Sequence, residues 1–313
     1  MRVAFDSRAG EDSRGIGRYA RALLAALREL DAGGELVETH RPRARGIDLY
    51  HSPWIDGALL RSPVPMVVTL HDLVPLKRRS EYLRTGLRFR MRYLAVKRAV
   101  RLIVPTTVVA EEAGELLGIP RERIAVIAEA PDSALGPRSE AEVADVRARY
   151  GLPEHYLLWV GGLEHPDPRK RVGALADAPR RMPLVLVGPT RPWAHELSGV
   201  TLTGEVTDAD LAALYTGAHA LVFPSDDEGF GLPPVEALAC GTPVVACDIP
   251  ATREVLGDRA TLVAPGDLGE LVSAAEAVTR PAPAPPPWTW ADAARATWQV
   301  YADAAERRGP AVP

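Results

Sequence analysis

The stretch from residue 221 to residue 248 most constrains what this chain can fold into. It reads LVFPSDDEGFGLPPVEALACGTPVVACD. The apolar run Leu221–Phe223 predicts a buried strand. A helix is expected to begin near Leu232, because two prolines stand in its first turn, where a missing N–H costs little. Gly241 ends this helix and the apolar run Val244–Ala246 predicts a second buried strand, so the stretch is a strand, glycine loop, helix and strand in series.

The same stretch has the residue types of a ligand site. A helix N-terminus attracts phosphate through its free N–H groups and partial positive charge, and glycines at 229 and 231 let a ligand come close. Glu236 lies about one turn into the helix, where its carboxylate can accept two hydrogen bonds from a sugar or ribose diol. Glu228 would face the other end of that ligand. The alternative is a plain tight turn with solvated glutamates.

Composition suits a globular protein and gives no reason to expect a nucleic-acid ligand. The 313 residues are 47% hydrophobic with a net charge of −4, and this length suits two domains. Residues 1–150 carry 25 basic and 20 acidic side chains, whereas the remainder carries 12 and 21. The N-terminal half is therefore the expected partner of an anionic surface or acceptor. Cys240 and Cys247 are expected to be buried packing residues.

Buried apolar runs alternate with helical patterns, which predicts an α/β fold with parallel sheets. The opening MRVAFDS predicts a strand rather than a signal peptide, and no apolar run approaches membrane-spanning length, so we expect a cytoplasmic protein. The predicted strands are residues 2–6, 36–39, 49–52, 66–70, 102–104, 124–128, 156–160, 184–187, 221–223 and 244–246.

Glu228, seven intervening residues and Glu236, within PSDDEGFGLPPVEALACGTPVV, resemble the EX7E region of glycosyltransferase family 4. That family comprises retaining enzymes of the GT-B fold. The resemblance implies that Glu236 binds the ribose of a nucleotide-sugar donor and that Glu228 lies by the donor sugar and the reacting centre. The residues it implies as further donor contacts in this stretch are Gly229, Phe230, Gly231 and Leu232.

The resemblance implies two Rossmann-like domains facing a cleft, with a C-terminal helix that crosses back to the N-terminal domain. We expect an acceptor domain at residues 1–135, a linker at 136–150 and a donor domain at 151–280. A Pro-rich spacer and the crossover helix are expected at 281–313.

A glycine turn is expected between the first strand and the first helix. Ser13 to Gly17 form this turn, and an amphipathic helix is predicted for Arg18–Leu30. The resemblance implies that Gly15 and Gly17 lie over the donor phosphates. A plain tight turn is the alternative.

Two histidines follow predicted strands of the N-terminal domain, where parallel sheets bind ligands. His51 is either a site residue or an ordinary structural histidine. His71 begins His71-Asp72-Leu73-Val74-Pro75, which resembles the HDL-x-P segment of the family and implies that His71 approaches the donor sugar. Asp72 is expected either to orient the imidazole or to contact the acceptor.

Residues 77–101 hold ten Lys or Arg side chains and one acid. A basic amphipathic helix of this kind suits an anionic membrane or a phosphorylated acceptor. An ordinary solvated helix face is equally compatible. Family members usually have a serine at position 106, where Thr106 stands, and an Asn-Gly pair near Glu129-Ala130; these departures are expected to change local hydrogen bonds more than chemistry.

Cations follow the first strand of the donor domain. After Gly161-Gly162, the run Arg169-Lys170-Arg171 suits a diphosphate, because arginine offers a fork and lysine a compact charge. The resemblance implies that Lys170 binds the donor diphosphate at a loop that includes Gly162. Whether Arg169 or Arg171 serves as the second cation stays open. Backbone groups from Gly204 to Val206 are implied to contact the nucleotide base.

The predicted activity is transfer of a hexose from a nucleoside-diphosphate sugar to an acceptor alcohol, with retention, in bacterial polysaccharide or glycolipid synthesis. GDP-mannose is the first guess for the donor and UDP-glucose the second. No Asp-x-Asp motif stands in a fitting loop, so we expect no metal and no other cofactor. The alternatives are a non-catalytic nucleotide-sugar-binding or scaffold protein and a nucleotide-sugar epimerase. The acceptor is not predicted.

Overall fold

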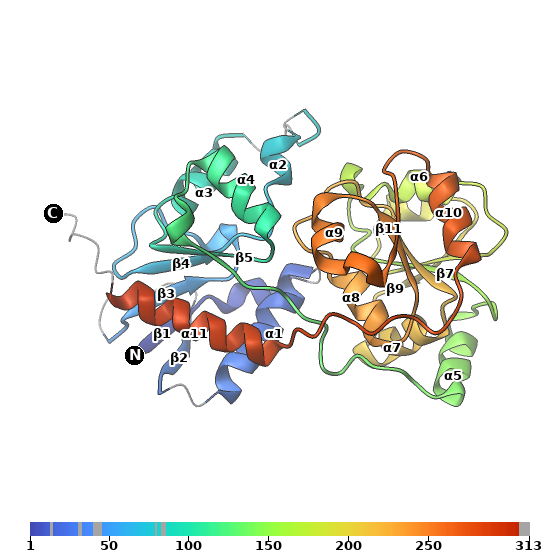
Figure 1. The fold of residues 1–313 in the computed structure, drawn as a ribbon, viewed down its shortest axis with the longest axis horizontal. Helices are drawn as coiled ribbons and strands as arrows, with labels where there is room; N and C mark the ends of the chain where they lie inside the picture. The colour runs from blue at the N-terminus through green and yellow to red at the C-terminus, as the bar shows by residue number, and fades with distance from the viewer. Residues whose placement is uncertain (13–14, 31–32, 40–45, 79, 83–85, 307–313) are drawn as a thin grey trace. The chain divides into compact units, whose positions relative to one another are not determined.

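The computed structural model of the chain describes residues 1–12, 15–30, 33–39, 46–78, 80–82 and 86–306. The chain divides into two compact units (Figure 1). The N-terminal unit comprises Met1–Glu129 together with Trp288–Pro313, and the C-terminal unit comprises Ala130–Pro287.

The N-terminal unit is built on a six-stranded parallel sheet in the order β2-β1-β3-β4-β5-β6. Every residue of β3 and β4 is buried, so these central strands are covered on both faces, as parallel strands usually are. The strands are β1 Arg2–Phe5, β2 Glu35–Glu38, β3 Leu49–Ser52, β4 Met66–Thr69, β5 Arg101–Val104 and β6 Ile124–Val126.

The α-helices described in this unit are α1 Gly15–Glu29, α2 Val74–Lys77, α3 Gly86–Val96, α4 Thr107–Leu117 and α11 Trp290–Glu306. The last of these confirms the crossover helix, since α11 lies alongside α1 (Figure 1) and the Trp298 indole N–H donates to the Leu27 carbonyl at 3.4 Å. The basic segment 77–101 is not one helix. It holds the end of α2, then α3, and Arg101 already belongs to β5, because the apolar run after it pairs with β4 and β6. Residues 79 and 83–85 of this segment lie outside the described part.

A buried hydrogen-bond chain ties α11 to the sheet. The Nδ1 atom of His51 lies 2.6 Å from the Tyr301 hydroxyl and its Nε2 atom lies 3.0 Å from the Thr69 hydroxyl. The Thr69 hydroxyl also lies 3.1 Å from the Tyr19 hydroxyl of α1. Burial lowers the pKa of His51 to about 3, so this imidazole is neutral and acts as a structural connector between β3 and α11.

The C-terminal unit has a second six-stranded parallel sheet, in the order β12-β11-β10-β7-β8-β9. Its strands are β7 Leu157–Val160, β8 Leu184–Val187, β9 Val200–Gly204, β10 Ala220–Phe223, β11 Val244–Cys247 and β12 Thr261–Val263. Its α-helices are α5 Glu140–Tyr150, α6 Val172–Asp177, α7 Asp208–Gly217, α8 Leu232–Ala239, α9 Pro250–Leu256 and α10 Leu268–Ala277. Cys240 and Cys247 are buried, unbridged and 1% exposed, as expected.

Helix α5 stands where the sequence predicted a linker at 136–150. Ser139 and Glu142 form a reciprocal capping box at its start, and Gly151 ends it in the left-handed conformation. The Arg149 and Tyr150 side chains bind the Asp210 carboxylate of α7 at 2.6 and 2.9 Å. These contacts make the segment part of the C-terminal unit.

Helix α1 begins earlier than predicted, at Gly15, so Gly15 and Gly17 lie in its first turn and not in a preceding loop. Ser13 and Arg14 of the predicted turn lie outside the described residues. A Cβ atom on Gly17 would lie 1.8 Å from the Asp12 carbonyl oxygen, whereas one on Gly15 would meet nothing within 4 Å. Glycine at 17 therefore permits close packing of the helix start, and glycine at 15 has no such steric reason.

The two glycines make a matched pair of substitutions. Gly17→Ala should lower the free energy of unfolding by about 1–3 kcal/mol, because the new methyl group overlaps backbone. Gly15→Ala should leave it unchanged or raise it by about 0.5–1 kcal/mol, since alanine favours helix. Urea unfolding, monitored by tryptophan fluorescence, measures the free energy of unfolding of both variants. Equal effects of the two substitutions would contradict the packing role of Gly17.

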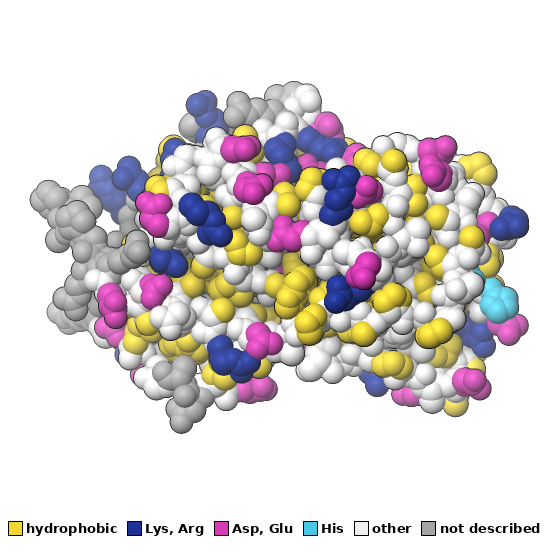
Figure 2. Space-filling view, viewed as in Figure 1, with side chains coloured by type: hydrophobic (Ala, Val, Ile, Leu, Met, Phe, Trp, Pro, Cys, Tyr) yellow, Lys and Arg dark blue, Asp and Glu magenta, His cyan; other side chains and the backbone are white. Residues whose placement is uncertain are grey.

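On the face displayed in Figure 2, Lys and Arg side chains are interspersed with Asp and Glu, in keeping with the net charge of −4. In the described part of the chain, no helix combines the length and the apolar character that a bilayer span needs.

Candidate functional site

The C-terminal unit builds a site where β10 gives way to α8. Gly231 precedes the helix with φ of 91°, a left-handed conformation that favours glycine, and a Cβ there would lie 3.4 Å from the Phe223 ring. Gly229, Phe230 and Leu232 are buried around it. The loop thus brings its backbone close to the first turn of α8, the geometry predicted from the glycine spacing.

Glu236 is 2% exposed, which excludes the solvated alternative for this residue. The Tyr215 hydroxyl on α7 donates a hydrogen bond to its Oε2 atom at 2.9 Å. Tyr215 was not predicted as a site residue, because it lies among the apolar positions of the helix it belongs to. The sequence pointed to it only indirectly, because a buried carboxylate such as that of Glu236 needs a buried hydrogen-bond donor.

Arg169 and Glu228 come together in the same unit. The Arg169 Nη1 atom lies 3.5 Å from Glu228 Oε2, and its Nε atom donates to Asp167 Oδ2 at 3.1 Å. The Arg169 carbonyl oxygen accepts from the Asp226 N–H at 3.0 Å, which joins this loop to the one after β10. The side chains of Arg169 and Glu228 are 16% and 12% exposed, and that of Asp167 is 25% exposed. The Arg169 guanidinium is therefore held in a defined position.

The two cations beside Arg169 have different surroundings. Lys170 Nζ lies 6.0 Å from the centre of the Trp159 ring. Arg171 has φ of 50°, and its guanidinium donates to the Gly266 carbonyl at 2.8 Å. Arg169, and not Arg171, is therefore the arginine that forms an ion pair with Glu228.

The remaining predicted donor contacts follow strand ends of the C-terminal unit. Gly162 is partly exposed just after β7. Gly204 ends β9 with φ of 73°, and its carbonyl accepts from the Gly188 N–H at 3.0 Å. Val206 is partly exposed two residues later. Parallel sheets bind ligands at this edge. The role of these three residues as donor contacts stays a prediction.

The N-terminal unit holds His71 between two acceptors. Its Nε2 atom lies 2.9 Å from the Pro53 carbonyl oxygen and its Nδ1 atom lies 3.0 Å from Glu129 Oε1. A carbonyl oxygen only accepts, so Nε2 carries a proton, and a carboxylate opposite Nδ1 favours a second proton there. The Tyr19 ring meets the imidazole edge-on, with ring centres 4.6 Å apart. The geometry describes an imidazolium–carboxylate pair.

Glu129, and not Asp72, is the carboxylate hydrogen-bonded to the His71 ring. Asp72 Oδ1 instead accepts from the Val74 N–H at 3.2 Å, at the start of α2. Burial lowers the pKa of His71, but the hydrogen bond and charge of Glu129, the Pro53 carbonyl and the Asp72 charge together hold it above its ordinary value. At the Glu129 departure, the Glu129 side chain thus contributes both a hydrogen bond and a negative charge to the neighbouring histidine, whereas the sequence predicted a change mainly in hydrogen bonds.

Replacing Glu129 should change the charge state of His71. Glu129→Gln should lower the pKa of His71 by about one unit or more, because the amide removes a full negative charge. Asp72→Asn should lower the pKa of His71 less, because the charge of Asp72 raises that pKa less than the charge and hydrogen bond of Glu129 do. NMR titration of the His71 ring proton measures both; an unchanged pKa in Glu129→Gln would contradict the ion pair. The stability that the pair contributes should be complete below about pH 6.5 and lost as the pH rises through the higher native pKa.

No cluster of three or more His, Cys, Asp or Glu side chains suited to a metal ion occurs among the residues described. The expected absence of a metal stays a prediction.

Two sequence families match this chain. The profile described as Glycosyltransferase Family 4 matches residues 13–133, and the one described as Glycosyl transferases group 1 matches residues 154–280. The serotype-specific mannosyltransferase WbdA of Escherichia coli is 31% identical over 234 residues, covering 67% of this chain and 28% of that protein. The chain thus spans less than a third of that curated relative.

Two solved structures share the fold along nearly the whole chain. Sucrose-phosphate synthase of Thermosynechococcus elongatus is 20% identical with a TM-score of 0.68, covering 98% of this chain and 97% of that one. HepE of Anabaena, solved in complex with UDP and glucose, is 19% identical with a TM-score of 0.68, covering 98% and 95%. At such identities the likeness concerns the fold, which is GT-B, with two parallel Rossmann-like sheets.

Proposed function

This chain belongs to glycosyltransferase family 4, and on that basis we propose that it transfers a hexose from a nucleoside-diphosphate sugar to an acceptor hydroxyl. The observation that carries the proposal is the arrangement at α8. A buried, hydrogen-bonded Glu236 and an Arg169–Glu228 pair lie on either side of a glycine loop at the N-terminus of a helix. That arrangement suits a ligand with a ribose, a diphosphate and a sugar.

In the proposed complex, Glu236 accepts the ribose hydroxyls, with Tyr215 holding the carboxylate in place. Gly229 to Leu232 present the loop and the start of α8 to the diphosphate, together with Lys170. Arg169 is the second diphosphate cation, and Glu228 faces the sugar. Gly162, Gly204 and Val206 line the nucleotide. Gly15 and Gly17 are proposed to approach the donor phosphates with the start of α1.

The hard step of the proposed reaction is departure of the diphosphate. The bond between the anomeric carbon and the diphosphate oxygen breaks, the nucleoside diphosphate leaves with the electron pair, and the acceptor oxygen forms the new bond with retention. The acceptor hydroxyl proton goes to the leaving diphosphate. Lys170, Arg169 and the helix dipole would stabilise the developing charge, and one such preorganised donor is typically worth about 3 kcal/mol.

The unit that carries His71 would contribute a positive charge. With both ring nitrogens hydrogen-bonded to Glu129 and Pro53, the imidazolium has no lone pair with which to act as a base. We therefore assign His71 an electrostatic role towards the donor and Glu129 a positioning role, with Asp72 shaping the adjacent turn.

Two donors are proposed, in order of preference. GDP-mannose is favoured because the relative WbdA is a mannosyltransferase, and UDP-glucose is the second choice because HepE was solved with UDP and glucose. A polysaccharide or glycolipid product and a cytoplasmic location stay predictions from the sequence.

Membrane contact through residues 77–101 is proposed only for part of that segment. Several of its cations are already paired, since Lys77 binds Glu112 at 2.6 Å and Arg92 binds Asp56 at 2.8 Å. The exposed residues described on α3 and just after it are Arg90, Met91, Leu94, Lys97 and Arg98. This mixed basic and apolar face suits the surface of an anionic bilayer.

The assignment of Arg169 is tested against Arg171. Arg169→Gln should weaken binding of GDP or UDP by about 1.5–3 kcal/mol, roughly ten- to a hundredfold, because a charge-assisted contact is lost. Arg171→Gln should leave the affinity nearly unchanged, since that guanidinium is engaged at Gly266. Isothermal titration calorimetry with each nucleotide measures both, and a larger loss in Arg171→Gln would reverse the assignment.

A further inference from the structure

The side chains around His71 include a tyrosine to which the proposed function gives no role. Tyr19 of α1 is 4% exposed, and its ring packs against the His71 imidazole with ring centres 4.6 Å apart and ring planes at 83°. This is the edge-to-face arrangement that aromatic rings prefer. The Tyr19 hydroxyl lies 3.1 Å from the Thr69 hydroxyl. Tyr19 is therefore held at its hydroxyl while its ring contacts the imidazole.

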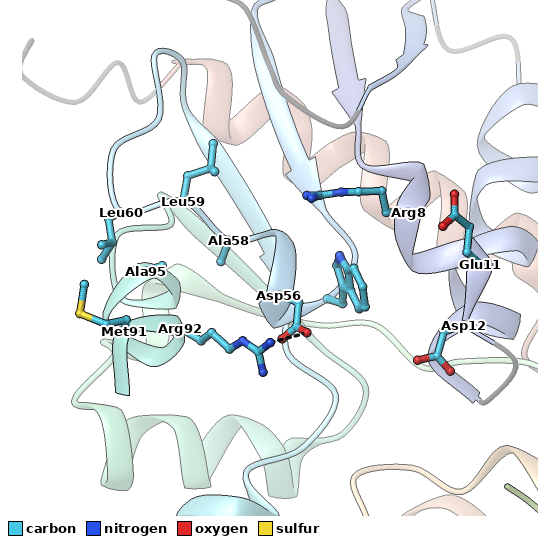
Figure 3. Close-up of a pocket in the computed structure, with 11 residues that line it drawn as sticks. Arg8, Glu11, Asp12, Asp56, Ala58, Leu59, Leu60, Met91, Arg92 and Ala95 are labelled. Carbon is cyan, nitrogen blue, oxygen red and sulfur yellow. Dashed lines mark ion pairs between the residues drawn. The ribbon is translucent and has the colours of Figure 1, made fainter. Parts of the chain in front are cut away.

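Two hydrogen bonds alone do not fix the orientation of the His71 ring. The Glu129 carboxylate and the Pro53 carbonyl set the directions of its two nitrogens. The Pro53 carbonyl belongs to the segment after β3 that continues into Trp54, a residue lining the pocket in Figure 3. Hydrogen bonds tolerate deviations of about 30° from a straight line, so the ring could still tilt about the axis through its nitrogens. The ring of Tyr19 is a third support, and it opposes this tilt.

Helix α11 supports Tyr19 in two ways. Trp290, the first residue of this helix, is 9% exposed, and its ring packs edge-on against that of Tyr19 with ring centres 5.7 Å apart. The second support is the hydrogen-bond chain that starts at Tyr301. It runs through His51 to the Thr69 hydroxyl, which lies beside the Tyr19 hydroxyl. Every member of this chain is less than 5% exposed, so its hydrogen bonds are shielded from competition by water.

Both passages of the chain between the two units end at these side chains. The chain leaves the N-terminal unit after Glu129 and returns to it at Trp288, shortly before Trp290. Glu129 contacts the His71 ring directly, and Trp290 contacts it through Tyr19. The surroundings of His71 are therefore complete only when the last helix of the sequence has packed onto the N-terminal unit.

We propose that Tyr19 is a positioning residue for His71 and that Trp290 holds Tyr19 in place. Tyr19 fixes the tilt of the imidazolium, and α11 fixes Tyr19 through Trp290. The contacts carry this positioning by themselves. Its consequence for catalysis rests on the proposed function, in which the charge of His71 acts on the donor. A misplacement of about 1 Å can cost about a hundredfold in rate, so the orientation of this charge should affect the chemical step.

The positioning is measured in the ligand-free chain by NMR of isotope-labelled histidine. The ring N–H protons of His71 are identified by their absence in His71→Gln. In the native chain both are hydrogen-bonded and should exchange slowly with water while the ring is protonated. Tyr19→Leu should speed this exchange about tenfold or more, because a tilting ring opens its hydrogen bonds more often. Tyr19→Phe, which keeps the aromatic ring, should retain most of the protection.

Two tryptophans on α11 form a matched pair that separates positioning from packing of the helix. Trp298 is 8% exposed, and its ring packs against Tyr301 with ring centres 5.3 Å apart. Trp290→Leu should speed the exchange of the His71 protons about tenfold, since Tyr19 loses its support. Trp298→Leu should change this exchange less than about twofold, although both substitutions remove a buried indole from the same helix. Trp290→Phe should restore most of the native protection.

Unchanged exchange of the His71 protons in Tyr19→Leu would overturn the proposal. Equal acceleration by Trp290→Leu and Trp298→Leu would also overturn it, because packing of α11 would then explain both effects. Urea unfolding shows whether each variant is folded. If Tyr19→Leu does not fold, the comparison of the two tryptophan variants decides alone.

Nucleotide binding is measured separately in the Tyr19 and Trp290 variants by calorimetry with GDP and UDP. It should be unchanged, because neither residue belongs to the proposed donor contacts. Absence of nucleotide binding in the wild-type chain would count against the proposed function and would leave the exchange result in force. With a donor that is turned over, Tyr19→Leu should lower kcat about tenfold at an unchanged donor KM. Faster exchange with an unchanged kcat would contradict the catalytic part of the proposal.

Discussion

Buried charge is the constraint on which both units depend. An ionised carboxylate taken out of water is costly unless hydrogen-bond donors or a cation replace the water. Asp6, Glu129 and Glu236 are all less than 5% exposed, and each has a partner from a different segment. Arg8 and Tyr50 bind Asp6, His71 binds Glu129, and Tyr215 binds Glu236. The parallel sheets supply the enclosure that makes these pairings necessary.

These pairs also orient the groups that chemistry would need. The Tyr215 hydroxyl holds the carboxylate of Glu236 beside the start of α8, and Asp167 holds Arg169 in reach of Glu228. In the N-terminal unit, Glu129 and Pro53 together hold His71 as a cation. Each unit therefore presents a preorganised charge, which is the form of catalysis expected for departure of a diphosphate.

Much of the fold and the loop before α8 could be predicted from the order of the residues. Short apolar runs bounded by turn residues predicted the described strands within a few residues, except β9 and β12. The glycine spacing around Glu228 and Glu236 predicted the loop before α8. Helix α5 was missed although Ser139 and Glu142 carry a capping-box signature, because charged residues dominate that segment. The start of α1 was misplaced because glycines were read as a turn, whereas Gly17 is required by close packing within the helix.

Partners distant in the chain could not be predicted in the same way. Glu129 lies 58 residues from His71, and Tyr215 lies 21 residues from Glu236. Nothing local distinguishes either residue, since one stands in a loop and the other among apolar helix positions. The pocket of Figure 3 is assembled from three separate segments. Such features follow from the fold, because only the sheet order brings those segments together.

We propose that the loop before α8 and its partners form a nucleotide-sugar site. Thermal unfolding of the chain against a panel of nucleoside diphosphates and nucleotide sugars, with and without EDTA, tests it most directly. A ligand at about 100 times its dissociation constant should add roughly 2.7 kcal/mol to the stability, a shift of a few degrees. We expect such a shift for one nucleotide class, unchanged by EDTA. No shift with any nucleotide would contradict it.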